Sequence, residues 1–233
     1  MHPILETLRG QLIVSCQAEG DDPFNRPEFI SLFAKAAAMG GAAGIRALGK
    51  ENISAIAKAT SLPVVGLTKG RFDDGTVLIT GDFPDVSEVL EAGAAIVALD
   101  ATARRRPNGL LGDGFVKAVK QRFDVPVLAD IGELEEARLA VDAGADAVAT
   151  TLSGYTPRTA QRQTTEPDWD LLEAMVRTLD APVIVEGGVW TPGHARRALE
   201  MGAHAVVVGT AITRPRVITS TFVTQMRKAR KEP

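Results

Sequence analysis

The sequence contains very little cysteine and histidine, the residues that most often build disulfides and metal sites. Cys16 is the single cysteine in 233 residues, which excludes an internal disulfide framework and any metal site made of several cysteines. We expect Cys16 to be a small buried hydrophobe. His2, His194 and His204 show no ligand spacing, so no metal site is predicted.

Long apolar runs and a strong excess of charge are also missing. No stretch approaches the roughly 18 consecutive apolar residues of a membrane helix, and the N-terminal MHPILETLRGQL has no basic region before a long apolar run. The formal net charge of -3 gives no indication of a nucleic-acid or membrane partner. We therefore expect a cytoplasmic protein in which any anion site is local.

The sequence does contain an internal repeat. A chain of 233 residues with 45% hydrophobic content is long enough for one large domain spanning residues 1–233. Between the repeated segments, apolar residues recur at three- and four-residue spacing, which predicts helices. Eight segments end in or contain a short apolar run that predicts a strand: QLIVSCQ (11–17), MGGAAGIRA (39–47), SLPVVGLTK (61–69), EAGAAIVALD (91–100), DVPVLADI (124–131), DAGADAVATT (142–151), DAPVIVEGG (180–188) and MGAHAVVVGT (201–210).

Alternating strands and helices indicate an α/β fold. Runs such as VIV and AVVV are apolar at successive positions, which is typical of parallel strands covered by helices on both faces. Eight such units match a (β/α)8 TIM barrel, for which about 250 residues is usual. A doubly wound open sheet is disfavoured, because QAEGDDPFNRP follows the first strand in place of G-x-G-x-x-G.

In such a barrel the C-terminal ends of the strands meet at one mouth, where active sites are built. A barrel end that served structure alone would need few polar caps. Here nearly every strand finishes in a polar or small residue, which predicts a site: Gln17, Arg46, Lys69, Asp100, Asp130, Thr150 with Thr151, Glu186 and Gly209.

The last two strands predict a phosphate site. EGG and VGTAITRP place glycines and backbone N–H groups where many barrels bind phosphate. Gly187, Gly188 and Gly209 would let a phosphate approach the backbone, and Thr210 and Arg214 would add a hydroxyl and a cation. The alternative is that these glycines only form tight turns.

Lys69 and Glu186 are the candidates for chemistry. A neutral lysine is a competent base and can also form a Schiff base, and the residues alone leave both open. Lys69 could instead be an exposed loop lysine, because GLTKGRF does not show where the strand stops. Residues 70–84 and 151–167 are expected to be long functional loops. The basic run ATARRRPNG (101–109) is either a solvated loop or a contact to a substrate anion.

Several motifs resemble those of the bacterial N-acetylmannosamine-6-phosphate 2-epimerases, the NanE family. They are VSCQA, GIRA, the lysine after strand three, ALDATARRRPNG, ADI followed by ELEEA, TLSGYT, VIVEGGVWTP and VVGTAITRP. The match runs from Gln11 to about Thr219. It implies a barrel of the ribulose-phosphate-binding type that interconverts N-acetylmannosamine 6-phosphate and N-acetylglucosamine 6-phosphate, in sialic acid or amino-sugar catabolism, without a metal or organic cofactor.

The resemblance also implies roles for single residues. Lys69 and Glu186 correspond to the catalytic lysine and glutamate of the family. Substrate-binding positions are Gln17, Arg46, Asp130 and Thr151, and phosphate-binding positions are Gly187, Gly188, Gly209, Thr210 and Arg214.

The chain departs from the family pattern at three places. Gly70 and Arg71 follow Lys69 where the family usually has Arg-Asp, Gly188 stands where it commonly has arginine, and VLITGDF (77–83) lacks its usual Thr-Pro-Thr. The alternatives to an epimerase are a Schiff-base aldolase or lyase that uses Lys69, and a non-catalytic sugar-phosphate sensor. The tail STFVTQMRKARKEP (220–233) predicts an amphipathic helix that closes the barrel or packs on a second subunit of a homodimer.

Overall fold

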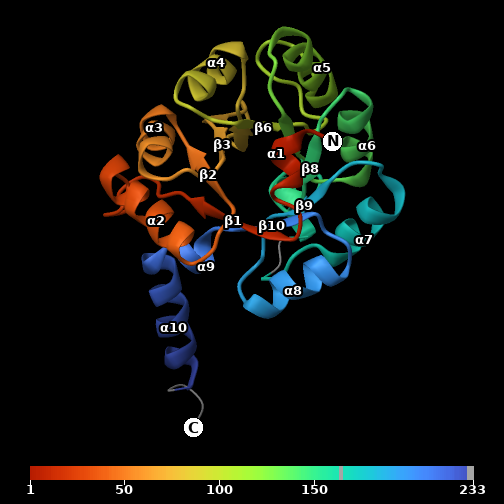
Figure 1. The fold of residues 1–233 in the computed structure, drawn as a ribbon. Helices are drawn as coiled ribbons and strands as arrows, with labels where there is room; N and C mark the ends of the chain where they lie inside the picture. Colours follow the sequence, from red (N-terminus) through yellow and green to blue (C-terminus); the bar gives the residue numbers. More distant parts are fainter. Residues whose placement is uncertain (163–164, 230–233) are drawn as a thin grey trace.

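A computed structural model describes residues 1–162 and 165–229. Its centre is a closed barrel of eight parallel strands, paired in the order β1-β10-β9-β8-β7-β6-β3-β2 (Figure 1). The predicted (β/α)8 barrel is therefore confirmed. The barrel strands are β1 (Gln11–Cys16), β2 (Gly44–Leu48), β3 (Val64–Leu67), β6 (Ile96–Asp100), β7 (Val127–Asp130), β8 (Ala147–Ala149), β9 (Val183–Val185) and β10 (Ala205–Val208).

The strands carry apolar residues at successive positions because each strand contacts two different cores. In β3, Val65 and Leu67 belong to the cluster that fills the barrel, whereas Val64 belongs to the cluster between sheet and helices. Successive side chains of a strand point to opposite faces, so both faces need apolar residues. Cys16 lies in the outer cluster and is buried. Burial raises the pKa of its thiol to about 12, as expected of a packing residue.

The helices of the repeat surround the barrel, as Figure 1 shows. Their starts carry the expected signals: Pro27 and Pro192 occupy first turns, and the side chains of Asp82 and Thr191 cap α4 and α8. The helices are α2 (Pro27–Met39), α3 (Lys50–Ala59), α4 (Phe83–Glu91), α5 (Gly112–Arg122), α6 (Leu134–Asp142), α7 (Trp169–Thr178) and α8 (Pro192–Glu200).

A short N-terminal helix, α1 (Pro3–Glu6), closes the end of the barrel opposite the mouth. Leu5 and Leu8 are fully buried and join the inner cluster beside Ile13. Nε2 of His204, a buried residue just before β10, lies 2.7 Å from the carbonyl oxygen of Leu5. The segment therefore acts as a plug, which the sequence analysis did not predict.

The predicted loop 70–84 contains a hairpin of two short antiparallel strands, β4 (Lys69–Arg71) and β5 (Val77–Ile79). Lys69 pairs with Ile79, and side chains of directly opposed residues lie on the same face. Ile79 is buried in the inner cluster, so Lys69 lies on the hairpin face turned to the barrel. Loop 151–167 holds two short 3-10 helices, η1 (Thr150–Leu152) and η2 (Ala160–Arg162); residues 163–164 lie outside the described residues.

The C-terminal tail forms a helix, as predicted. After the short α9 (Thr210–Thr213), helix α10 (Pro215–Ala229) extends away from the barrel (Figure 1). It therefore does not close the barrel; residues 230–233 lie outside the described residues. Among the helices of the described part of the chain, none is both long and apolar enough to span a membrane.

Candidate active site

Three strand ends bring a cation and two carboxylates together at the mouth. Arg46 on β2 donates to both carboxylate oxygens of Asp130 at the end of β7, at 3.1 and 2.6 Å. The same guanidinium lies 3.0 Å from Oε2 of Glu186, which follows β9. Thr151 donates to Asp130 at 2.6 Å and to Glu186 at 3.3 Å. The sequence predicted all four residues, and the structure joins them in one network.

Burial determines the electrostatics of this network. Arg46 is 1% exposed and Asp130 is fully buried, so the pair is shielded from solvent. Burial raises the pKa of Glu186 to about 6, although the Arg46 charge opposes the shift. The Asp130 carboxylate raises the pKa of Glu186 further, because like charges disfavour ionisation. Glu186 can therefore gain or lose a proton near neutral pH, which suits an acid/base group.

Thr150 fixes the backbone that presents Glu186. Its hydroxyl donates to the carbonyl oxygen of Glu186 at 2.9 Å and accepts from the Glu186 N–H at 3.1 Å. Thr150 lies at the end of β8, the strand that neighbours β9. These two contacts fix the peptide units on both sides of Glu186, from which its carboxylate extends.

Lys69 approaches the mouth from the hairpin rather than from the end of β3. Its amine makes an ion pair with Glu19, in the loop after β1, and its charge lowers the pKa of Glu186. Burial raises the pKa of Glu19, but Lys69, with the nearby Arg214 and Arg71, brings it below its ordinary value. Neither Glu19 nor Arg71 was predicted as a site residue, because neither ends a barrel strand. One signal in the sequence was available. Lys69 and Arg71 are two residues apart, and in a strand this spacing places both side chains on the same face.

Gln17 and Asp100 do not contact the Arg46 network. Gln17 is half-buried and donates to Ser15 at 2.6 Å. Asp100 is buried but pairs with Arg104, at 2.6 Å. The Gln17 side chain thus has no charged partner among these residues, whereas the Asp100 carboxylate is paired with Arg104.

The predicted phosphate residues lie on two neighbouring strand ends. Strand β9 pairs with β10, so the loops that follow them are adjacent. Gly187 and Gly188 have φ of 98° and 70°, a conformation that favours glycine. Among the described residues, no hydrogen bond uses the N–H of Gly187, Gly188, Gly209 or Thr210. The half-buried Arg214 also has a buried Nε without a partner in the described chain.

Packing leaves no room for a side chain at Gly188. A Cβ at this position would lie 2.2 Å from the carbonyl carbon of Glu166 and 2.5 Å from the nitrogen of Pro167. The segment before α7 therefore occupies the space that a side chain would need. At Gly187 no atom of residues 1–162 or 165–229 lies within 4 Å of such a Cβ.

The basic run 101–109 places its three arginines in different environments. Arg106 is 2% exposed, and its guanidinium lies 4.2 Å from the Phe115 ring. Burial lowers the pKa of Arg106 to about 10. Arg105 is exposed and donates to the carbonyl of Gly109. Arg104 and Arg106 bind other parts of the chain, so neither is a solvated side chain. A contact between the run and a substrate anion stays a prediction.

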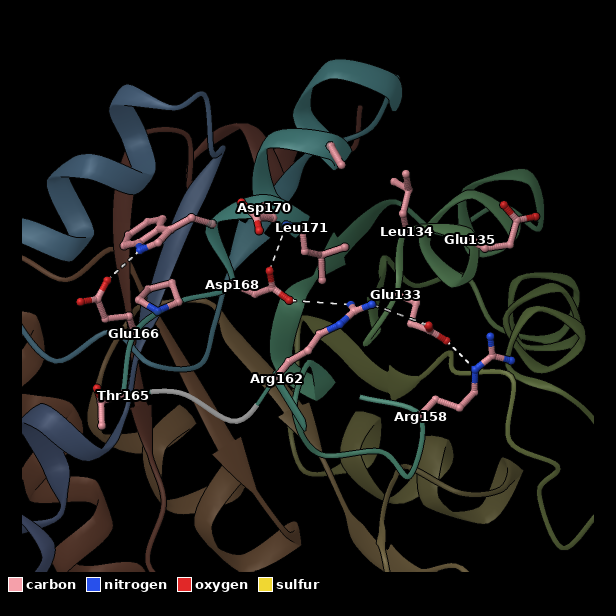
Figure 2. Close-up of a pocket in the computed structure, with 13 residues that line it drawn as sticks. Glu133, Leu134, Glu135, Arg158, Arg162, Thr165, Glu166, Asp168, Asp170 and Leu171 are labelled. Carbon is pink, nitrogen blue, oxygen red and sulfur yellow. Dashed lines mark hydrogen bonds and ion pairs between the residues drawn. The ribbon is translucent and has the colours of Figure 1, made fainter. Parts of the chain in front are cut away.

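A cavity of about 930 Å³ lies beside the starts of α6 and α7 (Figure 2). Its charged lining residues are largely paired, with Arg158 2.8 Å from Glu133 and Arg162 3.9 Å from Asp168. Neither Arg46 nor Glu186 lines it. Trp169, which also lines the cavity, donates to Glu166 at 3.0 Å. The network of Arg46, Asp130 and Glu186 therefore lies outside this cavity.

Comparisons with known proteins agree with the geometry. A family model described as "Putative N-acetylmannosamine-6-phosphate epimerase" matches residues 30–228. Curated proteins described as "Putative N-acetylmannosamine-6-phosphate 2-epimerase" are 46% identical: one from Caldanaerobacter subterraneus subsp. tengcongensis over 228 residues (97% of this chain, 95% of that protein) and one from Clostridioides difficile over 220 residues (94% and 97%).

A solved structure of the N-acetylmannosamine-6-phosphate 2-epimerase from Clostridium perfringens also matches. It has a TM-score of 0.89 and 42% identity, and the match covers 96% of each chain. The resemblance inferred from the motifs is thereby confirmed. The chain belongs to the N-acetylmannosamine-6-phosphate epimerase family.

Proposed function

We propose that this chain is an isomerase that interconverts N-acetylmannosamine 6-phosphate and N-acetylglucosamine 6-phosphate, as part of sialic acid or amino-sugar breakdown. The observation that carries the proposal is the buried network at the mouth, in which Arg46 contacts both Asp130 and Glu186. It supplies an acid/base group beside a fixed cation. The family relationship gives the substrate class, a phosphorylated amino sugar.

The reaction begins with opening of the sugar ring. The proton on C2 can be removed only when C1 is a carbonyl, because the carbonyl accepts the electrons left behind. Ionised Glu186 accepts the proton of the O1 hydroxyl as the C1–O5 bond breaks, and water protonates O5. A pKa of about 6 makes Glu186 ionised at neutral pH yet basic enough to hold this proton.

Proton transfer at C2 follows. Lys69 first passes its ammonium proton to Glu19, its ion-pair partner, and the resulting amine then takes the C2 proton. Negative charge develops on O1, where the Arg46 guanidinium stabilises it. Glu186 then returns its proton to the opposite face of C2. On ring closure Lys69 gives a proton to O1 while O5 loses one to water. Glu19 then returns its proton to Lys69, so Glu186, Lys69 and Glu19 all regain their starting states.

Binding energy from the rest of the sugar phosphate fixes C2 near these groups. We assign the phosphate to the N–H groups of Gly187, Gly188 and Gly209, with Thr210 and Arg214. Gln17, Asp130 and Thr151 are assigned to the sugar, because hydroxyl and amide groups need both donors and acceptors.

The test is proton NMR of N-acetylmannosamine 6-phosphate incubated with the protein in D2O. We expect N-acetylglucosamine 6-phosphate to form and the C2 proton signal to disappear. Lys69→Met should lower the rate by about 10²–10⁴-fold, and Lys58→Met, an exposed change on α3, should not. No product and no deuterium would reject the function, and borohydride trapping of a carbonyl on Lys69 would instead indicate a Schiff-base lyase.

The homodimer also stays a proposal, and α10 supports it. Ile218, Phe222 and Met226 recur every four residues and share one helix face. Phe222 is 67% exposed and Met226 is 62% exposed, although a helix face of this kind is stabilised by burial. We propose that residues 1–233 form one barrel domain, that α10 packs on a second copy, and that the protein is cytoplasmic.

A further inference from the structure

Two charged residues beside the mouth have no part in the proposed chemistry. Asp100, 1% exposed, ends β6. One of its carboxylate oxygens accepts from Arg104 at 2.6 Å, and the other accepts from the N–H and the hydroxyl of Thr102 at 3.0 and 2.7 Å. The barrel therefore holds the Asp100–Arg104 pair in place, and Arg104 can in turn position another part of the chain.

Arg104 reaches from this pair to the tip of the β4–β5 hairpin. Its Nη1 donates to the hydroxyl of Thr76 at 2.8 Å, and its guanidinium carbon lies 4.2 Å from the centre of the Phe72 ring. The N–H of Phe72 donates to the carbonyl of Thr76 at 2.9 Å, which closes the turn. One side chain thus contacts both sides of the hairpin tip.

The base of the hairpin is fixed separately. Thr80 is fully buried and has φ of 45°, a conformation that L residues rarely adopt. Its hydroxyl donates to the carbonyl of Ala98 on β6 at 2.7 Å and accepts from the N–H of Thr68 at 3.2 Å. Lys69 follows Thr68 directly, so its position depends on the base and the tip together.

We propose that Arg104 is a positioning residue that clamps the hairpin and holds Lys69 over the barrel mouth. The proposal rests on the proposed function, in which Lys69 acts on C2. Arg104 does not need to touch the substrate, because its Nε, Nη1 and Nη2 already donate to Thr102, Thr76 and Asp100. Misplacement of a reacting group by about 1 Å can cost up to about 100-fold in rate.

The test compares Arg104→Gln with Arg105→Gln in the same loop, because Arg105 is exposed and bonds only within that loop. We expect Arg104→Gln to lower kcat about 10- to 100-fold with KM for N-acetylmannosamine 6-phosphate within about threefold. Amide hydrogen exchange of residues 70–79 should accelerate in this variant. Arg105→Gln should match the unaltered protein in all three measurements.

A second pair of variants keeps the test decisive if Arg104→Gln does not fold. Thr76→Val removes the acceptor at the hairpin tip but retains the Arg104–Asp100 pair, so we expect a smaller fall in kcat and a smaller acceleration of exchange. Thr76→Ser keeps the hydroxyl and should return kcat and the exchange rate to those of the unaltered protein. Unchanged kcat and exchange, or a raised KM with unchanged kcat, would overturn the proposal. If the unaltered protein shows no epimerase activity, the proposed function fails, and the exchange rates still decide whether Arg104 clamps the hairpin.

Discussion

At the scale of single residues, the position of Glu186 sets its chemistry. Burial beside Asp130 raises the pKa of Glu186 to about 6 from an ordinary value of 4.5. The sequence predicted the carboxylate at the end of its strand, because strand ends converge in this fold. The pKa shift of Glu186 depends on which charged side chains lie close to it. These are Arg46 on β2 and Asp130 on β7.

We predict that kcat/KM falls as the pH drops below about 6, because only the ionised form of Glu186 accepts the O1 proton. Glu186→Gln should remove this dependence and lower kcat by about 10²–10⁴-fold. A raised folded-state pKa also means that the contribution of Glu186 to stability is present below pH 4.5 and is lost as the pH rises through about 6. A pH profile without an acid limb near 6 would contradict the assignment.

The two adjacent glycines of the proposed phosphate loop give a matched comparison. Gly187→Ala places a Cβ in open space, so only the positive φ of 98° opposes it; we expect a loss of about 1 kcal/mol in the free energy of unfolding. Gly188→Ala adds a collision with the backbone of Glu166 and should cost about 2–4 kcal/mol. Equal losses in denaturant unfolding would show that the segment before α7 moves aside.

At the scale of elements, the sequence predicted what repeats and missed what occurs once. The eight barrel strands and their helices follow from apolar runs and helical spacing. The β4–β5 hairpin could not be predicted in this way, because β4 and β5 have three residues each and β4 (KGR) contains no apolar side chain. The plug α1 has four residues, too few to show a period.

The plug should contribute measurably to stability. Leu5 is 1% exposed inside the barrel, so Leu5→Ala should lower the free energy of unfolding by about 2–5 kcal/mol. Leu139→Ala on α6 is the control, because Leu139 is 41% exposed and its loss should change stability by no more than about 0.5 kcal/mol. Equal effects of the two changes in urea titrations would mean that the barrel end does not depend on α1.

At the scale of the whole molecule, the projecting helix α10 predicts the state of association. A double change, Phe222→Glu with Met226→Glu, should convert a dimer to a monomer in sedimentation velocity measurements, because charge replaces apolar surface at the interface. Thr224→Glu is the control: two residues along the helix from Phe222, it points to the opposite face. A protein that is monomeric before any change would reject the homodimer.

The sequence by itself determined the barrel, the strand-end residues of the mouth and the family. These follow from local periodicity and from side chains whose placement depends only on where a strand ends. Tertiary structure alone decided that Lys69 reaches the mouth on a hairpin paired with Glu19, that Asp100 binds Arg104, and that Gly188 packs on Glu166. The contacts of Lys69 with Glu19 and of Gly188 with Glu166 join segments far apart in the chain, and no local pattern fixes such a distance. Asp100 and Arg104 are only four residues apart, but they lie in a strand end and an irregular loop, where no periodicity predicts a pair.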